Sequence, residues 1–233
     1  MTRHQMFADF LWNRLEEVDS SLLMDCLWYQ EDEYECDICE DFDLLREQLR
    51  ADWVKYGLTK AVIKFPEIPD VVFKIPFTGI KYFYWDEREE VYQYGSQKKY
   101  EYDYCEREFS IYKMAKEANV ADPLARTDYL MTYGGVDIYI SEYCLDYDDN
   151  FQECSDNSRK TAKTLCDSIG INSWDEREVT AFLVESYGEE LATKFMHFVK
   201  TNDLSDFHEG NRGWTWDNRF KLIDYSSYLE KGL

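Results

Sequence analysis

Two pairs of short apolar segments, each pair joined by a tight turn, dominate the middle of this sequence. Residues 61–65 and 71–75 are rich in β-branched and aromatic side chains, and the PEIPD segment (66–70) between them holds two prolines. Because proline suits a turn and β-branched residues suit strands, this pair predicts a hairpin. The segments YLMTYGG and VDIYISEYC predict a second hairpin that turns at Gly134 and Gly135. The middle of the chain is therefore expected to form an antiparallel sheet.

Helical patterns surround these strands. Apolar residues recur near a period of 3.6 within residues 1–52, and residues 104–119 fit one amphipathic helix between the two hairpins. After the second hairpin, the pattern is helical to near Thr201, and Ser173 with Glu176 predicts a capping box at a helix start. The expected fold class is α+β, with a sheet-rich segment between two helical ones.

The charge of the chain limits its partners. It carries 26 Lys and Arg against 48 Asp and Glu, a formal net charge of −22, while 45% of its residues are hydrophobic. The hydrophobic content supports a packed core, and the negative charge disfavours binding to nucleic acid and to anionic membranes. An acidic run covers residues 31–43. A solvated loop or helix face is the favoured interpretation of this run over a partner-binding or cation-binding patch.

The cysteines favour a reducing compartment. Seven irregularly spaced cysteines do not suggest a disulfide framework, and no apolar run is long enough for a signal peptide or a membrane span. We therefore expect a cytoplasmic protein that does not bind membranes. Cys36 and Cys39 form one CxxC motif ten residues after Cys26, and free thiols are favoured there over a metal site.

The stretch that carries the most chemistry is SDFHEGN, followed by a predicted hairpin and KLIDYS. Asp206 and Asn211 lie in the loop, and the hairpin predicted from GWTW and FKLI would return the chain so that Asp224 lies beside them. Two carboxylates and an amide oxygen are hard ligands of the kind Mg²⁺ prefers when phosphate oxygens and water complete its coordination. One aspartate could hold metal while the other orients a nucleophile.

This stretch resembles the catalytic loop and metal-binding segment of the protein-kinase-like superfamily. The form D-x-H-x-x-N is closer to the aminoglycoside, choline and other small-molecule kinases than to protein kinases. The resemblance implies that Asp206 is the catalytic aspartate and that Asn211 and Asp224 bind Mg²⁺. As a lone residue, His208 is expected to make a local hydrogen bond that shapes the loop.

The resemblance also implies a nucleotide-binding lysine and a glutamate that holds it. VVFKIP places Lys74 in the second strand of the first hairpin, and the following helix offers Glu108, with Glu106 as a competitor. The implied catalytic residues are therefore Asp206, Lys74 and Glu108. The implied cofactors are ATP and Mg²⁺.

Further nucleotide contacts implied by the resemblance are Gly57, Thr59, Lys74, Glu142 and Cys144. The expected domains are a helical acidic extension (1–52), a kinase-like sheet lobe with one helix (53–144) and a minimal helical lobe with the catalytic loop (145–233). The segment YGLTKAVI offers one glycine where the family has two or three, and Leu204-Ser205 replaces the family's His-Arg.

Three functions remain open. The first is a phosphotransferase of bilobal kinase-like fold whose acceptor the sequence does not identify. Only nine residues follow Asp224, so we expect a truncated helical lobe that offers little surface to a folded peptide substrate. The second is a pseudokinase that binds nucleotide or a partner protein as a scaffold, which the poor glycine loop favours. The third is an acidic DNA mimic, for which only the net charge argues.

Overall fold

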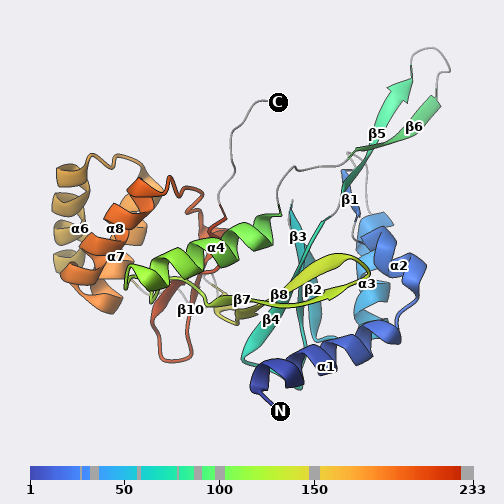
Figure 1. Ribbon diagram of the computed structural model, residues 1–233. Coiled ribbons are helices and arrows are strands. Elements are labelled where there is room, and N and C mark those ends of the chain that lie inside the picture. Colours follow the sequence, from blue (N-terminus) through green and yellow to red (C-terminus); the bar gives the residue numbers. More distant parts are fainter. Residues whose placement is uncertain are drawn as a thin grey trace. The chain divides into compact units, whose positions relative to one another are not determined.

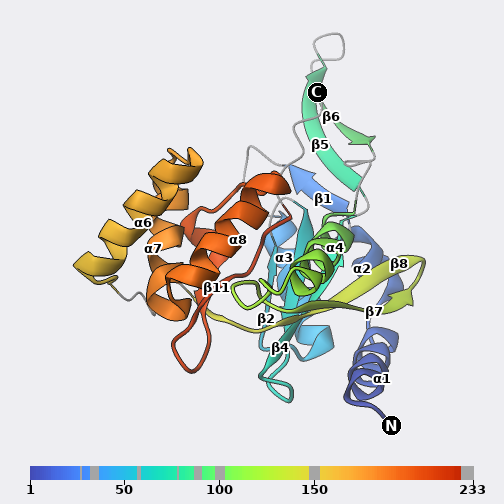
Figure 2. The same cartoon turned by 60° about the vertical axis from the view of Figure 1, so that its left-hand side comes forward.

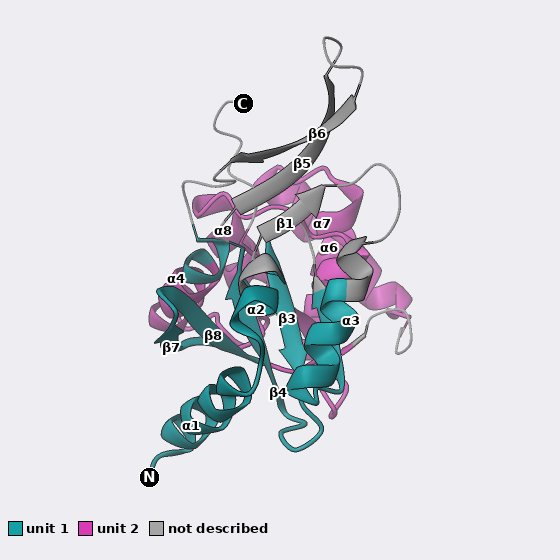
Figure 3. Ribbon diagram, turned by 90° about the vertical axis from the view of Figure 1, so that its right-hand side faces the viewer, with its two compact units in different colours: residues 1–107, 128–141 teal, residues 108–127, 142–233 magenta. Residues whose placement is uncertain are grey.

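The computed structural model describes residues 1–26, 28–31, 37–56, 59–77, 79–86, 91–97, 103–146 and 153–226. The chain divides into two compact units (Figure 3). Unit 1 contains residues 1–107 and 128–141, and unit 2 contains residues 108–127 and 142–233. The chain is α+β, with a five-stranded antiparallel sheet.

The elements follow the order shown in Figure 1. The helices are α1 (Arg3–Glu16), α2 (Ser20–Cys26), α3 (Asp37–Leu49), α4 (Tyr104–Glu117), α6 (Asp156–Ile169), α7 (Trp174–Tyr187), α8 (Glu189–Thr201) and the 3-10 turn η1 (Glu209–Asn211). The strands are β1 (Trp28–Glu31), β2 (Trp53–Tyr56), β3 (Lys60–Lys64), β4 (Val71–Pro76), β5 (Gly79–Asp86), β6 (Val91–Gln97), β7 (Thr127–Tyr133), β8 (Val136–Glu142), β9 (Leu145–Asp146), β10 (Arg212–Trp214) and β11 (Phe220–Leu222).

The main sheet of unit 1 has the strand order β2-β3-β4-β8-β7. Strands β3 and β4 pair antiparallel, with Val62 opposite Lys74, as the prolines between them predict. Strands β7 and β8 meet at the predicted Gly134–Gly135 turn, where both glycines have a positive φ. Both hairpins predicted for this sheet are confirmed.

The N-terminal helices cover one face of this sheet. Alternate residues of β3 and β4, including Ile63 and Phe73, join one buried cluster with Leu11 and Leu15 of α1 and Leu45 of α3. This burial is the main stabilising contribution to unit 1, because each fully buried aliphatic or aromatic side chain contributes about 1.5–3 kcal/mol. Buried side chains of α1, α2 and α3 are therefore part of the core of unit 1.

The expectation of an all-helical segment over residues 1–52 was wrong in one place. Residues 28–31 form β1, which pairs parallel with β5 from Trp28 opposite Gly79. Strand β5 also pairs antiparallel with β6, so a second sheet has the order β1-β5-β6. The partner of β1 lies about fifty residues later in the chain, and a local helical period carries no information about such a pairing.

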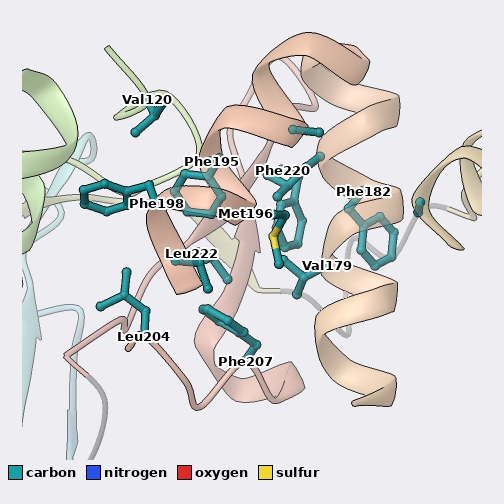
Figure 4. Close-up of a cluster of buried hydrophobic side chains, with 14 of the residues drawn as sticks. Val120, Val179, Phe182, Phe195, Met196, Phe198, Leu204, Phe207, Phe220 and Leu222 are labelled. Atoms are coloured by element: carbon teal, nitrogen blue, oxygen red, sulfur yellow. The ribbon is translucent and has the colours of Figure 1, made fainter. Parts of the chain in front are cut away.

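The described part of unit 2 contains α6, α7 and α8, most of α4 and a small sheet. Helix α7 contacts both α6 and α8 (Figure 2), and β10 pairs antiparallel with β9 and with β11. The buried side chains of these elements form one cluster, in which Phe182 stacks on Phe220 with ring centroids 5.1 Å apart (Figure 4). Helix α4 crosses the division: its first four residues belong to unit 1 and the rest to unit 2.

The predicted helix signals hold in detail. Ser173 is the N-cap of α7, and its Oγ accepts a 3.1 Å hydrogen bond from the Glu176 N–H. Residues 104–117 form α4, and Asn119 follows it in the left-handed conformation that commonly ends a helix. No helix in the described ranges is both long and apolar enough to cross a membrane.

The described cysteines with placed side chains are all buried: Cys26, Cys105, Cys144, Cys154 and Cys166. No disulfide joins these five described cysteines. Cys36 lies outside the described residues, and so does the side chain of Cys39.

Candidate functional site

A loop after α8 carries the predicted catalytic aspartate. Leu204 and Phe207 are buried in the core of unit 2 and fix the loop on both sides of Asp206 (Figure 4). The Asp206 side chain is 27% exposed, so it remains accessible between two buried anchors. Its backbone has φ +70°, a left-handed conformation that costs a non-glycine residue energy unless neighbouring contacts hold it.

Asn211 provides such a contact. Its Nδ2 donates a 2.7 Å hydrogen bond to the carbonyl of Asp206, and the residue is only 7% exposed. With Nδ2 used as a donor, Oδ1 is the atom of this side chain that can bind a cation. The predicted metal ligand therefore also helps to fix the backbone of the predicted catalytic residue.

His208 shapes the loop as predicted. Its Nδ1 accepts a 3.1 Å hydrogen bond from the Gly210 N–H and caps η1. This bond assigns the ring proton to Nε2, which lies 3.5 Å from Oδ1 of Asp206. The histidine thus links the predicted catalytic aspartate to the turn that contains Asn211.

The predicted hairpin returns the chain to the loop. Arg212 lies opposite Leu222 in the β10–β11 pair, and the next residue, Ile223, donates a 2.9 Å hydrogen bond from its N–H to the Asn211 carbonyl. Asp224 follows directly, and its Oδ1 accepts a 3.1 Å hydrogen bond from Oγ of Ser226. The backbones of Asn211 and Asp224 are therefore brought close together within unit 2.

Gly213 permits this close return. A Cβ at this position would lie 2.9 Å from Cβ of Cys144 and 2.9 Å from the carbonyl oxygen of Leu145. Only a residue without a side chain lets β10 approach the preceding segment so closely.

Tyr225 fixes the residue next to Asp224. It is fully buried, and its hydroxyl donates a 2.8 Å hydrogen bond to the carbonyl of Ala125. Burial, followed by the negative charge of Glu108, raises the pKa of Tyr225 well above its usual value. This side chain therefore remains neutral over the physiological range.

The structure distinguishes the two glutamates that the sequence left open. Glu108 is fully buried in unit 2, and its charge acts on Tyr225, whereas Glu106 is exposed in the first turn of α4. A buried carboxylate needs compensating partners, so its position is constrained in a way that the exposed one is not. Glu108 is therefore the buried one of the two glutamates, and its role as the partner of Lys74 stays a prediction.

Two predicted nucleotide-binding residues lie in unit 1. Lys74 is buried, and it alternates with Phe73 and Ile75 along β4, so its side chain leaves the sheet on the face opposite α1 and α3. Thr59 is also buried, immediately before β3. Gly57 lies outside the described residues.

The other two predicted nucleotide contacts make structural contacts in unit 2. The Glu142 carboxylate lies 3.2 Å from Nζ of Lys221 and accepts a hydrogen bond from the Arg126 N–H. Cys144 is buried, and its Cβ lies against Gly213 of β10.

Sequence reasoning missed one prominent residue, Arg212. Its side chain is fully buried, and it hydrogen-bonds to the carbonyl of Phe207 and to carboxylates of α7. No local motif marks it, because its carboxylate partners precede it by more than thirty residues.

The donor set of the loop fits a hard cation. The predicted ligands are the Asp224 carboxylate and Oδ1 of Asn211, and oxygen donors of this kind suit Mg²⁺ rather than zinc. Among the residues that the structure describes, no group of three or more His, Cys, Asp and Glu side chains could hold a metal ion. The predicted pair would therefore rely on phosphate oxygens and water for its remaining ligands.

Comparison with known proteins gives no match: no family model, no curated protein and no solved structure is significantly similar to this chain.

Proposed function

We propose that this chain is an ATP- and Mg²⁺-dependent phosphotransferase of protein-kinase-like fold that transfers phosphate to a hydroxyl acceptor. The observation that carries the proposal is the double connection of Asn211. Its side chain binds the Asp206 carbonyl, and its own carbonyl binds the N–H of Ile223, next to Asp224. These two hydrogen bonds bring together the backbones of Asp206, Asn211 and Asp224. Asp206 carries a partly exposed carboxylate, and the other two are the predicted oxygen ligands of Mg²⁺. Phosphoryl transfer requires a set of this kind.

In this proposal Asp206 is the general base that takes the proton of the acceptor hydroxyl. Nε2 of His208 lies beside Oδ1 of Asp206, which assigns the other carboxylate oxygen to the acceptor hydroxyl. As the hydroxyl oxygen bonds to the γ-phosphorus, the bond between that phosphorus and ADP breaks and the hydroxyl proton passes to Asp206. Asp224 and Asn211 would hold Mg²⁺, which when bound offsets the negative charge of the phosphates.

The resemblance of the sequence to kinase-like proteins adds two roles. Lys74 is assigned to the nucleotide phosphates and Glu108 to the orientation of that lysine. The burial of both side chains supports roles that depend on a fixed position. Local positive charge from the lysine and the metal is needed because the chain as a whole is strongly acidic.

Two assays on one set of variants test the proposal. The wild-type protein should melt at a higher temperature with Mg-ATP, because a ligand that binds only the folded state stabilises it. Asp206→Asn should keep this shift and lose at least about 100-fold in the rate of phosphate transfer or release, the lower end of the usual effect of a general base. The matched control is Asp203→Asn, an exposed residue of the same segment whose left-handed backbone asparagine tolerates.

The outcomes separate the candidate functions. Mg-ATP stabilisation with turnover that depends on Asp206 supports the phosphotransferase. Stabilisation without turnover on any acceptor contradicts it in favour of a nucleotide-binding scaffold. No stabilisation of the wild-type protein by Mg-ATP contradicts both.

A further inference from the structure

Arg212 joins the candidate catalytic loop to α7. Its side chain is fully buried, and three of its nitrogens make short contacts within unit 2. Nε donates to the carbonyl of Phe207 at 2.6 Å, Nη1 to Oε2 of Glu178 at 2.5 Å and Nη2 to Oδ1 of Asp175 at 2.9 Å. One rigid guanidinium therefore binds the backbone of the loop and two carboxylates of a helix at the same time.

The two carboxylates are well placed on α7. Asp175 and Glu178 are three residues apart, which puts them on one face of the helix. Asp175 lies in the first turn, where the helix dipole favours a negative charge. The Ser173 cap fixes that turn. Arg212 is thus bound at a part of α7 whose backbone is fixed by the Ser173 cap.

The carbonyl that Arg212 binds is next to the catalytic aspartate. Phe207 follows Asp206 directly, so two consecutive carbonyls of the loop are held by two consecutive side chains. Asn211 binds the first carbonyl and Arg212 the second. The peptide groups after a left-handed Asp206 are fixed in this way, and with them the direction in which its carboxylate leaves the backbone.

We propose that Arg212 is a positioning residue of the phosphotransferase, which sets the orientation of Asp206 from an anchor on α7. A buried hydrophobic side chain could fill the same space without two carboxylate partners, so packing alone does not account for the arginine. Its fork of donors can hold a carbonyl and two carboxylates together, and a lysine at this position has no such geometry. This inference rests on the proposed function, because orientation of Asp206 matters only if Asp206 acts.

The test compares Arg212→Lys with Arg177→Lys. Arg177 lies on α7 itself and, like Arg212, pairs with a carboxylate, that of Asp167, but no hydrogen bond or ion pair recorded among the described residues joins it to the loop, which makes it a matched control. With ATP hydrolysis as the readout, Arg212→Lys should lower kcat at least tenfold while KM for ATP stays within about twofold and the Mg-ATP melting shift remains. Arg177→Lys should leave kcat and KM unchanged.

A second variant guards against misfolding. Glu178→Gln keeps the shape of the partner and one acceptor oxygen, and it should lower kcat about threefold with KM unchanged. An unchanged kcat in Arg212→Lys overturns the inference. Equal losses in Arg212→Lys and Arg177→Lys also overturn it, because they show a general effect on α7.

Amide hydrogen exchange separates this inference from the proposed function. Exchange at the N–H groups of Asn211 and Ile223 should be at least tenfold faster in Arg212→Lys than in Arg177→Lys. If the wild-type protein shows no ATP turnover, the proposed function is contradicted, but faster exchange in Arg212→Lys would still support the inference that Arg212 fixes the loop backbone. Equal exchange in the two variants overturns that inference, whatever the activity.

Discussion

The side-chain amide of Asn211 donates a 2.7 Å hydrogen bond to the backbone carbonyl of Asp206, five residues before it. The bond holds the left-handed backbone of the aspartate and, under the proposed function, leaves Oδ1 of the asparagine as the atom that would bind a cation. One residue therefore serves both the predicted catalytic group and the predicted metal site.

Asn211→Asp separates these two tasks. Aspartate keeps an oxygen ligand but cannot donate to the Asp206 carbonyl, and its charge would face that carbonyl. We expect the free energy of unfolding to fall by about 1–3 kcal/mol, the usual effect of a buried acceptor left unsatisfied. Urea denaturation followed by circular dichroism measures it.

The control is Asn218→Asp in the exposed turn between β10 and β11, where the backbone is also left-handed. This change should alter the free energy of unfolding by less than about 0.5 kcal/mol. Equal stability of Asn211→Asp and wild-type protein would show that the bond to Asp206 contributes little.

Gly213→Ala tests the close return of the hairpin. The new Cβ would meet Cβ of Cys144 and the Leu145 carbonyl at 2.9 Å, so one of these segments must move. Such overpacking costs about 1–3 kcal/mol, which thermal or urea unfolding detects.

Trp216→Tyr, a mostly exposed position on the same hairpin, should unfold like the wild-type protein and serves as the control. If Gly213→Ala were as stable as this control, the close approach of β10 to residues 144–145 would be incorrect.

Local signals in the sequence predicted most of the secondary structure. The prolines of residues 66–70 and the Gly134–Gly135 pair located the two hairpins of the main sheet, and Ser173 located the start of α7. These signals work because capping and turn geometry depend on a few neighbouring residues. The loop of Asp206, the β10–β11 hairpin and the local bond of His208 were predicted for the same reason.

Contacts between distant residues were not predictable in this way. Helix α1 packs on the sheet through pairs such as Phe10 and Phe65, whose ring centroids are 5.1 Å apart, and neither residue carries a local sign of the other. The same holds for the pairing of β1 with β5 and for Arg212 with Glu178. Periodicity shows which face of an element is apolar but not what covers it.

Tyr225→Phe should change the pH dependence of stability. Burial raises the pKa of Tyr225, so the unfolded chain loses this proton first, and wild-type stability falls as the pH rises above about 10, the usual tyrosine value. The variant lacks this group, so its free energy of unfolding should fall less between about pH 9 and pH 11. At pH 7 it should be about 1 kcal/mol less stable, because the hydrogen bond to Ala125 is lost.

Tyr129→Phe, at a 39% exposed position of unit 1, is the control and should keep the wild-type slope at alkaline pH. Parallel stability curves for Tyr225→Phe and the wild-type protein in this range would contradict the burial of Tyr225 as a neutral group.

Glu108→Gln and Glu106→Gln decide between the two glutamates of α4. Under the proposed function, Glu108→Gln should lower kcat/KM for ATP at least tenfold, because the proposal assigns this buried carboxylate to the orientation of Lys74. Glu106→Gln, at an exposed site in the same helix, should stay within twofold of the wild-type value. The reverse order of effects would move the assignment to Glu106.

The central claim is that Asp224 and Asn211 form a magnesium-dependent nucleotide site, and titration calorimetry with ATP tests it most directly. Wild-type protein should bind ATP with Mg²⁺ and at least tenfold more weakly with the metal chelated. Asp224→Asn should lose this dependence on Mg²⁺, whereas the Asp203→Asn control should keep it. Equal binding of ATP by the wild-type protein and Asp224→Asn, or no binding by the wild-type protein, would contradict the account.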